Sequence, residues 1–213
     1  MRPFALERLL AARLYVITPE LDPERIAALA AAVLRGGADV LQLRHKSLAR
    51  GDLLPLARRI RDLTRRAGAL FIVNDHLDLA LLSEADGVHL GPDDLSVAGA
   101  RAAAGDRLLI GASASSPSSA VAAIASGANY IGSGPAFATP LKPHKGVIGP
   151  KGVTDVAAAV GPSIPVFAIG GIDRSNIAQL TEIGVRRACV VRAVGDAADP
   201  EAAARELRAM LEP

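Results

Sequence analysis

One sequence pattern recurs along the chain, and this repetition constrains the fold more than any other feature. Each copy has the end of a helix rich in small apolar residues, a Gly or Ala break, a short strand with β-branched residues, and a polar residue where the strand ends. Four copies are plain, at 35–42, 84–89, 126–132 and 183–190. In each copy we expect the Gly to cap the helix and turn the chain back into a parallel strand.

The same alternation can be followed through the whole sequence. Strands are predicted at 14–18, 40–44, 70–74, 87–90, 108–113, 130–133, 165–169 and 188–192. Helices are predicted at 23–35, 53–67, 76–83, 96–104, 117–126, 150–160, 175–183 and 199–211, where apolar residues recur at i, i+3 and i+4. Helical spacing in 1–13 predicts a further short helix at the N-terminus.

Strict alternation of strands and helices implies a parallel sheet. Eight such units in 213 residues favour a closed (β/α)8 TIM barrel, although an open doubly wound sheet remains if one strand is misassigned. Residues 1–213 contain no stretch that is typical of a linker. We therefore expect one α/β TIM-barrel domain that carries a short N-terminal helix.

Composition excludes several classes of function. The formal net charge of +2 is small, the basic residues are scattered, and four Phe, two Tyr and no Trp offer few stacking surfaces, so nucleic acid is not an expected partner. No apolar run reaches the roughly 18 residues that indicate a membrane span, and the charged N-terminus does not resemble a signal peptide. The single cysteine, Cys189, is predicted to be a buried hydrophobe. We expect a cytoplasmic protein.

In a TIM barrel the active site lies where the strands end. The predicted strand ends carry polar, charged or glycine residues: Thr18, Gln42 with Arg44 and Lys46, Asn74 with Asp75, His89 with Asp94, Ser113, Ser133-Gly134-Pro135, Gly170-Gly171 and Arg192. This ring on an apolar scaffold predicts a site for phosphorylated small molecules.

Gln42, Arg44 and Lys46 stand at alternate positions, so in a strand they would point to one side, toward the barrel interior or its mouth. Two interpretations of the cations remain open. Arg44 and Lys46 could form a structural ion pair with Asp75 or Asp94. Alternatively they could clamp a phosphate or pyrophosphate, Arg44 as a planar fork and Lys46 as a point charge.

Asp75 and Asp94 each follow a strand end and precede a helix. Each could be a helix N-cap. Alternatively, the two carboxylates could hold Mg²⁺ through oxygen ligands and water while phosphates complete the coordination shell.

Two loops add further candidates. Gly170-Gly171 and Arg192, after the seventh and eighth strands, fit a phosphate site, with a plain tight turn as the alternative. The segment 134–150 is long and Pro-rich, and Thr139, Lys142 and Lys145 give it hydroxyl and cationic groups. It is predicted to be a lid, with surface disorder as the alternative. His76 and His144 lack partners at metal-ligand spacing and are predicted to be surface residues.

The ordered set of motifs resembles the thiamine-phosphate synthase family from about Leu14 to Pro200. The pieces that carry the resemblance are Gln42-Leu43-Arg44-His45-Lys46, Val73-Asn74-Asp75, His89-Leu90-Gly91 with Asp94, Gly111-Ala112-Ser113, Gly134-Pro135 with Thr139 and Lys142, Ile169-Gly170-Gly171-Ile172, and Val191-Arg192-Ala193-Val194. Each piece alone is weak, whereas their order is specific.

The resemblance implies a Mg²⁺-dependent transfer in which hydroxymethylpyrimidine pyrophosphate loses pyrophosphate and the nitrogen of a thiazole phosphate captures the pyrimidine methylene carbon. It further implies roles for single residues. Pyrophosphate would be bound by Arg44, Lys46 and Asn74, and the metal by Asp75 and Asp94. Ser113 and Lys142 would assist the leaving group, and Gln42 would contact the pyrimidine. The thiazole phosphate would be bound by Thr139, Gly171, Val191 and Arg192.

Three positions depart from the family pattern, because Ser115, Pro92 and Leu141 stand where members often have His, Gln and Thr. Leu141 removes a hydroxyl that could bind phosphate. The nearest rival is a thiazole tautomerase that lacks the paired carboxylates and uses a His after strand five, and both features favour the synthase here. A phosphate-handling isomerase or epimerase and a non-catalytic sensor of thiamine intermediates remain as alternatives. The sequence leaves the oligomeric state open.

Overall fold

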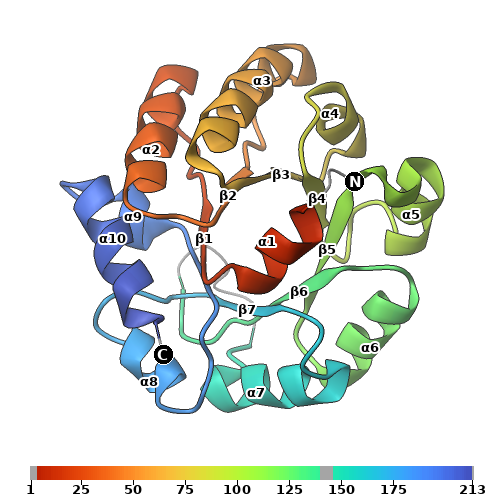
Figure 1. Cartoon of the computed structure of the whole chain (residues 1–213). Coiled ribbons are helices and arrows are strands. Elements are labelled where there is room, and N and C mark those ends of the chain that lie inside the picture. Colours follow the sequence, from red (N-terminus) through yellow and green to blue (C-terminus); the bar gives the residue numbers. More distant parts are fainter. Residues whose placement is uncertain (1–3, 140–145, 213) are drawn as a thin grey trace.

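The computed structural model describes residues 4–139 and 146–212. Its strands are β1 (Leu14–Ile17), β2 (Val40–Leu43), β3 (Leu70–Asn74), β4 (Gly87–Leu90), β5 (Leu109–Ala114), β6 (Tyr130–Ser133), β7 (Val166–Ile169) and β8 (Ala188–Val190). All pair in parallel with their sequence neighbours, and β8 pairs with β1 to close the barrel (Figure 1). The expected TIM barrel is confirmed.

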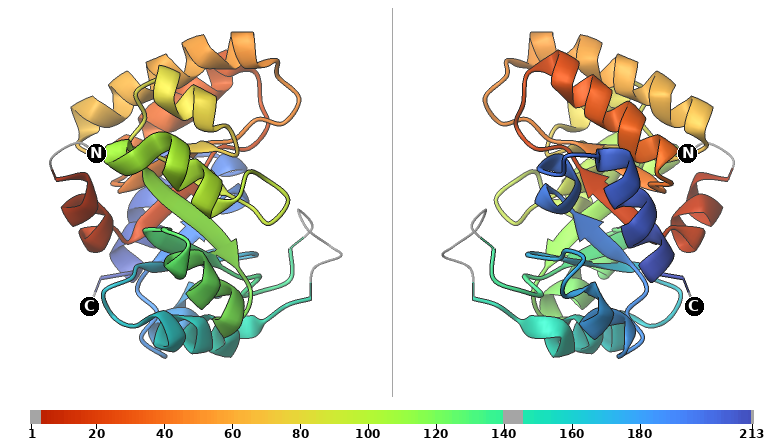
Figure 2. Two further views of the ribbon diagram at one scale, coloured as in Figure 1. Left: turned by 90° about the vertical axis from the view of Figure 1, so that its right-hand side faces the viewer. Right: turned by 90° about the vertical axis from the view of Figure 1, so that its left-hand side faces the viewer.

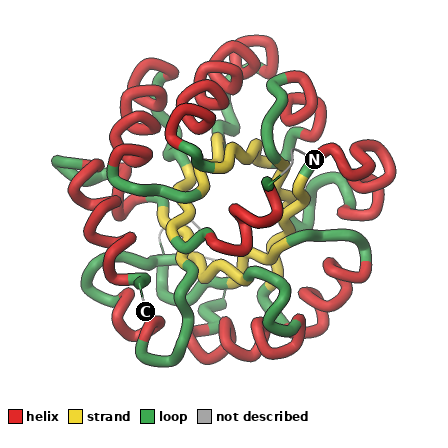
Figure 3. The backbone as a smooth tube through the Cα atoms, viewed as in Figure 1, coloured by secondary structure: helices red, strands yellow, loops and turns green. Residues whose placement is uncertain are grey.

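Most of the helices form a ring outside the strands, whereas α1 lies across one end of the barrel (Figure 3). The helices are α1 (Ala5–Ala11), α2 (Pro23–Arg35), α3 (Arg50–Ala67), α4 (Leu77–Leu82), α5 (Val97–Ala104) with the 3-10 turn η1 (Gly105–Arg107), α6 (Pro117–Ala125), α7 (Gly149–Val160), α8 (Ile177–Thr181), α9 (Arg192–Gly195) and α10 (Pro200–Met210). Of the helices in the described ranges, none is long and apolar enough to cross a membrane.

The strands bury both faces, as parallel strands in a barrel must. One set of side chains, including Val16, Leu41 and Phe71, packs beneath the outer helices. The alternate set, including Tyr15 and Phe167, fills the barrel interior together with Leu9 of α1. Cys189 belongs to this interior set and is buried, as predicted.

The two ends of the barrel differ. Helix α1 lies across one end, and the arrow of β5 points away from it (Figures 1 and 2). The carboxyl ends of the parallel strands therefore meet at the opposite end, and the loops that follow the strands form the mouth there.

One predicted boundary is wrong in a way that matters for the site. The eighth strand was expected to run to Arg192, but β8 ends at Val190. Val191 leaves the extended region at ψ −78°, and Arg192 is the first residue of α9. The run Ala188-Cys189-Val190-Val191 is typical of a strand, whereas the backbone bond from Gly195 N–H to Val191 O (2.9 Å) ends it early.

The glycine of the second repeat also has a different place from the one predicted. In that copy Glu84, not glycine, takes the left-handed conformation after the helix, at φ 54°. Gly87 instead lies inside β4, where an added Cβ would stand 2.5 Å from Leu109 O. Close packing against the next strand therefore explains this glycine.

Candidate active site

Four predicted polar side chains come from neighbouring strands and meet at the mouth. Asn74 on β3 pairs in register with His89 on β4, and Ser113 on β5 pairs with Gly132 on β6. Gln42 on β2 is almost fully buried and reaches into the barrel interior. The strand ends thus bring together the ring that the sequence predicted on this side of the barrel.

Asp75 and Asp94 form a carboxyl pair at this mouth. Their side chains are hydrogen-bonded to each other, and the N–H of Gly91 donates to Asp94 Oδ2 (2.8 Å). Neither aspartate is an N-cap: His76 holds that position in α4, and Ser96 caps α5. The N-cap alternative is therefore wrong for both.

Burial raises the pKa of Asp75, and the hydrogen bond and negative charge of Asp94 raise it further. Burial also opposes ionisation of Asp94, but hydrogen bonds from Asp75 and the Gly91 N–H outweigh it and lower the pKa of Asp94. Lys46 and His76 favour ionisation of both carboxyls. The two pKa values are thus pushed apart, and a bound cation would favour ionisation of both carboxyls.

The backbone holds Asp75 in an unusual conformation. Its φ is 62°, a region that residues other than glycine rarely adopt. The bond from His76 N–H to Asn74 O (2.7 Å) closes a three-residue turn around it, and the Asp75 N–H donates to His89 O (2.9 Å). Such local strain is typical of functional sites, because the surrounding structure must hold it in place.

The carboxyl pair fits a hard divalent cation. Its ligands are oxygens, which Mg²⁺ prefers, and Mg²⁺ commonly takes one or two carboxylates and completes its shell with phosphate and water. Within residues 4–139 and 146–212, no three His, Cys, Asp or Glu side chains form a group that could hold a metal ion. The metal would therefore depend on the substrate for further ligands.

Arg44 and Lys46 follow β2 instead of belonging to it. Because the strand ends at Leu43, their alternation within a strand was a wrong expectation. Backbone contacts hold the segment in place: Thr18 Oγ1 accepts from the Arg44 N–H (3.0 Å), and Glu20 accepts from the Lys46 N–H (2.6 Å). That hydrogen bond from Lys46, with the charge of Arg44, lowers the pKa of Glu20.

The ion pair between Lys46 and Asp75, one of the two interpretations of this lysine, is present but long. Lys46 Nζ lies 3.9 Å from Asp75 Oδ2, and the lysine side chain is 60% exposed. An exposed pair at that distance contributes little to stability. The lysine therefore remains available to an anion that approaches the carboxyl pair.

The loops after β6 and β7 run side by side. The Phe137 N–H donates to Gly170 O (2.9 Å), and an added Cβ at Gly171 would stand 2.3 Å from Ala138 O. Close approach of the two backbones, together with a φ of 62°, explains Gly171. Thr139 lies at the end of this described stretch and is partly buried.

The predicted phosphate site draws on β7 and β8. Ile169 on β7 pairs with Cys189 on β8, so the segments that begin at Gly170 and Val191 follow neighbouring strands. Arg192 is exposed at the start of α9. Lys142, Lys145, His144 and Leu141 lie outside the described residues.

Sequence reasoning missed several residues around the site. His76, predicted to be a surface residue, is partly buried and acts electrostatically on both carboxyls. His89 is hydrogen-bonded to Ser113, with Nε2 and Oγ 3.0 Å apart, and through Tyr130 to Tyr15. His89 was predicted at a strand end, whereas the two tyrosines look like ordinary core positions in the sequence. Ser115 and Pro92, two of the departures, are exposed.

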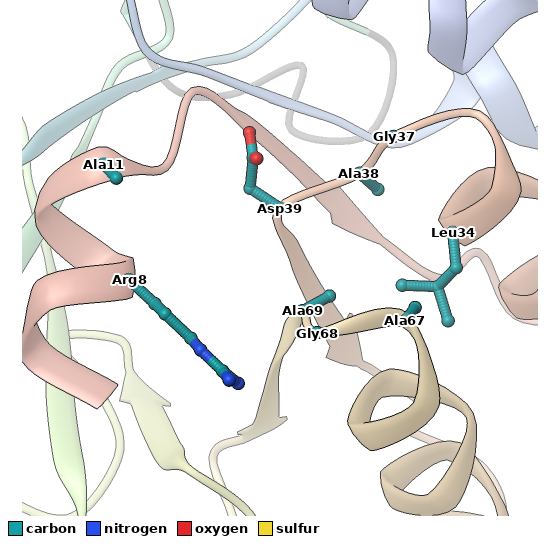
Figure 4. A pocket seen from close by; sticks show the side chains of 9 residues that line it. All are labelled: Arg8, Ala11, Leu34, Gly37, Ala38, Asp39, Ala67, Gly68 and Ala69. Carbon is teal, nitrogen blue, oxygen red and sulfur yellow. The ribbon is translucent and has the colours of Figure 1, made fainter. Parts of the chain in front are cut away.

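A separate pocket of about 250 Å³ lies at the opposite end of the barrel, beside α1 (Figure 4). It is lined by Arg8, Ala11, Leu34, Gly37, Ala38, Asp39, Ala67, Gly68 and Ala69. Figure 4 shows Arg8 extending from α1 across this hollow. Its lining comes from segments that precede β2 and β3, so it is distinct from the mouth.

Comparison with known proteins gives the family. A family model described as thiamine monophosphate synthase matches residues 14–194. The chain belongs to this family. Similar members include the thiamine-phosphate synthases of Methanoculleus marisnigri (47% identity over 92% of this chain and 93% of that protein) and Thermobifida fusca (45% identity over 96% and 94%). The thiamine phosphate pyrophosphorylase of Pyrococcus furiosus superposes with a TM-score of 0.85 at 36% identity, covering 96% of this chain and 97% of that one.

Some family members are longer than this chain. The thiamine-phosphate synthase of Gloeobacter violaceus is 48% identical over 91% of this chain, but the match spans only 55% of that protein. The corresponding share is 56% for the relative from Thermosynechococcus vestitus. The chain thus spans about half the length of these two relatives. A 3-hexulose-6-phosphate synthase, at a TM-score of 0.71 and 22% identity over 93% of this chain and 99% of that one, shares the barrel fold.

Proposed function

We propose that the protein condenses 4-amino-2-methyl-5-hydroxymethylpyrimidine pyrophosphate with 4-methyl-5-(2-hydroxyethyl)thiazole phosphate, giving thiamine phosphate and pyrophosphate. The observation that carries the proposal is the carboxyl pair Asp75 and Asp94 beside Lys46, at the mouth of a barrel whose relatives are named for this activity. A cytoplasmic setting, with small-molecule substrates and neither nucleic acid nor a membrane as a partner, completes the proposal.

The reaction breaks a carbon–oxygen bond and forms a carbon–nitrogen bond. The pyrophosphate leaves with the electron pair of its bond to the methylene carbon, the electron-rich aminopyrimidine stabilises the cation left behind, and the thiazole nitrogen supplies the new pair. The protein therefore has little covalent chemistry to perform. Its task is to position two substrates and to stabilise the charge that develops on the leaving group.

The cofactor in this proposal is Mg²⁺, held by Asp75 and Asp94. When bound, the ion neutralises charge on the pyrophosphate. Arg44, Lys46 and Asn74 bind the same pyrophosphate, and Ser113 and Lys142 donate hydrogen bonds to the leaving oxygen. Arg44, Lys46, Asn74 and Ser113 lie at or just after the ends of β2, β3 and β5, which supports their assignment to a single substrate.

The remaining residues bind the organic parts of the two substrates. Gln42, at the floor of the mouth, contacts the pyrimidine. Thr139, Gly171 and the backbone of Val191 and Arg192 bind the thiazole phosphate, and the pairing of β7 with β8, the strands that precede three of these residues, supports this grouping. The two substrates then enter from opposite halves of the barrel mouth.

The test is to mix the purified protein with both substrates and Mg²⁺, and to measure thiamine phosphate and pyrophosphate with and without EDTA. Product that disappears with EDTA is expected. The variant Asp75→Ala, Asp94→Ala should lose several orders of magnitude in turnover, whereas Asp106→Ala, a fully exposed aspartate, serves as the matched control.

Other outcomes point to the alternatives. Tight binding of both substrates without product would identify a sensor of thiamine intermediates. Isomerisation of a sugar or thiazole phosphate that is independent of Mg²⁺ would identify an isomerase or a tautomerase. Unchanged turnover in the double aspartate variant would contradict the metal role even if product forms.

A further inference from the structure

We propose that a hydrogen-bonded network inside the barrel fixes the tautomer of His89 and thereby makes the Ser113 hydroxyl a donor toward the mouth. We call it the interior network; its members are Gln42, Tyr15, Tyr130, His89 and Ser113. Tyr15, Tyr130 and His89 are positioning residues in this view. The identity of the anion that Ser113 meets rests on the proposed function, whereas the direction of the network does not.

The interior network is continuous from one side of the barrel to the other. Gln42 Nε2 lies 2.7 Å from Tyr15 Oη, which lies 3.0 Å from Tyr130 Oη. Tyr130 Oη lies 3.3 Å from His89 Nδ1, and His89 Nε2 lies 3.0 Å from Ser113 Oγ. The five residues come from β2, β1, β6, β4 and β5. Gln42 and Ser113, both assigned to substrate, are thus its two ends.

Packing leaves the tyrosines little freedom to break these contacts. Both are buried, and each ring packs edge-on against Phe167, with centroids 5.3 Å from Tyr15 and 5.9 Å from Tyr130. Two glycines open the space: an added Cβ would stand 2.1 Å from the Tyr130 ring at Gly111 and 3.2 Å from the His89 ring at Gly132. The interior is therefore shaped around these rings.

Counting donors gives the network a direction. The Gln42 amide donates to Tyr15 Oη. In the part of the chain that the structure describes, the Tyr15 hydroxyl bonds only to Gln42 and Tyr130, so its own proton goes to Tyr130. A buried hydroxyl must donate somewhere, and Tyr130, already accepting, donates to His89 Nδ1.

The same counting fixes the far end. Because His89 Nδ1 accepts, the ring proton sits on Nε2 and is donated to Ser113 Oγ. Ser113, with its lone pair engaged, is left to donate its own proton into the mouth. Burial raises the pKa of both tyrosines, so both stay protonated and the network keeps its direction.

This direction matters because an ionised phosphate oxygen only accepts hydrogen bonds. If the Gln42 amide turned its oxygen toward Tyr15, every bond would reverse, and Ser113 would donate to His89 and present lone pairs to the anion. The buried Gln42 amide, several residues away, therefore determines whether Ser113 stabilises or opposes a leaving pyrophosphate.

The decisive experiment is ¹⁵N NMR of the His89 ring, which needs neither substrate nor activity. The sequence contains four histidines, so a His89→Gln variant assigns the signals. We expect the Nε2–H tautomer in the unaltered protein and a mixture of tautomers in Tyr130→Phe. In Gln42→Glu, measured where the new carboxylate is ionised, we expect Nδ1–H, because a carboxylate can only accept from Tyr15.

An Nδ1–H tautomer in the unaltered protein would overturn the proposal. So would an unchanged tautomer in both variants, with circular dichroism showing that they fold. If Gln42→Glu fails to fold, Tyr130→Phe alone decides. Since none of these readouts depends on catalysis, they stand or fall separately from the proposed function.

Kinetics then test the consequence for the reaction. Tyr130→Phe should lower kcat about tenfold and leave KM within about twofold, because the network acts on the leaving group. Tyr15→Phe, Tyr130→Phe together should cost no more than the worse single variant, since residues that act as a unit are not additive. Phe167→Leu, which disturbs the same packing without removing a hydroxyl, is the control and should leave kcat within about twofold. Equal losses of kcat in Tyr15→Phe, Tyr130→Phe, the double variant and Phe167→Leu would show that the tyrosines contribute only through packing.

Discussion

The backbone of Asp75 is strained and the pKa of its carboxyl group is raised, and surrounding residues cause both effects. The turn between Asn74 and His76 holds the positive φ, and Asp94 adds charge to a partly buried carboxyl. An aspartate after a strand is common, and the sequence alone allowed an N-cap. Only the three-dimensional contacts distinguish an N-cap from a member of a carboxyl pair, because the pair depends on Asp94, which follows the next strand.

Affinity for Mg²⁺ should fall as the pH falls through the raised pKa of Asp75, because below that pKa the cation must displace a proton from Asp75. Calorimetry of Mg²⁺ binding in two buffers of different ionisation enthalpy would count the proton released. Asp94→Asn should reduce the release, since the hydrogen bond and charge of Asp94 raise the pKa of Asp75, whereas burial, the largest cause, remains. No proton release at any pH through this range in the unaltered protein would contradict the raised pKa of Asp75.

Stability without metal should follow the same pair. A raised pKa means that the folded state binds more protons than the unfolded state, so above the ordinary value of 3.8 the free energy of unfolding should fall as the pH rises through the pKa of Asp75. The lowered pKa of Asp94 has the opposite sign, and its contribution is lost only below 3.8. Urea unfolding across this pH range, with and without Mg²⁺, would distinguish the pH range in which Asp75 changes stability from the range in which Asp94 does.

Gly171→Ala should destabilise the protein more than Gly184→Ala. Both residues have positive φ, at 62° and 84°, so each alanine costs about 1–2 kcal/mol in backbone strain. Only at Gly171 would the new Cβ meet backbone, 2.3 Å from Ala138 O, whereas nothing lies within 4 Å at Gly184. Urea unfolding should show the difference, and a raised KM for the thiazole phosphate should accompany it. Equal losses would show that the loop after β6 yields freely.

At the scale of elements, α1 closes the end of the barrel that lacks the site. Leu9 is fully buried there and Leu10, its neighbour, is 40% exposed. Leu9→Ala should cost about 2–5 kcal/mol of unfolding free energy, whereas Leu10→Ala should cost under about 1 kcal/mol. Because the mouth is at the opposite end, kcat should not change in either variant. A loss of activity at 25 °C in a folded Leu9→Ala protein would contradict this separation.

Much of the fold could be predicted because a (β/α)8 barrel is built from local signals. Helix ends, β-branched strands and the polar residues that follow them lie within a few positions of one another, and the predicted strands agree with β1 to β7 within a residue at each end. The eighth differs, since Val190-Val191 favours an extended chain and only the turn of α9 interrupts it.

The site was predicted less completely than the fold, because the sequence did not indicate contacts between residues that are far apart along the chain. Strand-end residues can be read from their position in the sequence, and this rule predicted that Asp75, Asp94 and Ser113 lie at the barrel mouth. Tyr15 and Tyr130 are 115 residues apart in sequence and meet only because the barrel closes. No spacing rule relates them, and their apolar neighbours make both look like plain core residues.

At the scale of the whole molecule, stability and chemistry occupy opposite ends of one barrel. Asp39, before β2, shows how the stable end is joined. Its Oδ2 accepts from the backbone N–H groups of Arg13 and Leu14 (2.9 Å each), and Arg208 Nε of α10 lies 2.8 Å away. One carboxylate thus links the entry to β1, the entry to β2 and the last helix.

Asp39→Ala should therefore destabilise the entire barrel. It removes the acceptor of two backbone N–H groups and of Arg208 Nε, although the Arg208 guanidinium keeps its pair with Glu212, and the expected cost is about 2–4 kcal/mol. Glu24→Ala, which removes an exposed ion pair with Arg59, is the control and should cost under about 1 kcal/mol. Urea unfolding should remain a single transition with an unchanged m-value, because β1 and β8 pair and no part can open alone. A separate early transition of α10 would instead show that the last helix detaches independently, and kcat, set at the other end of the barrel, should stay the same in both variants.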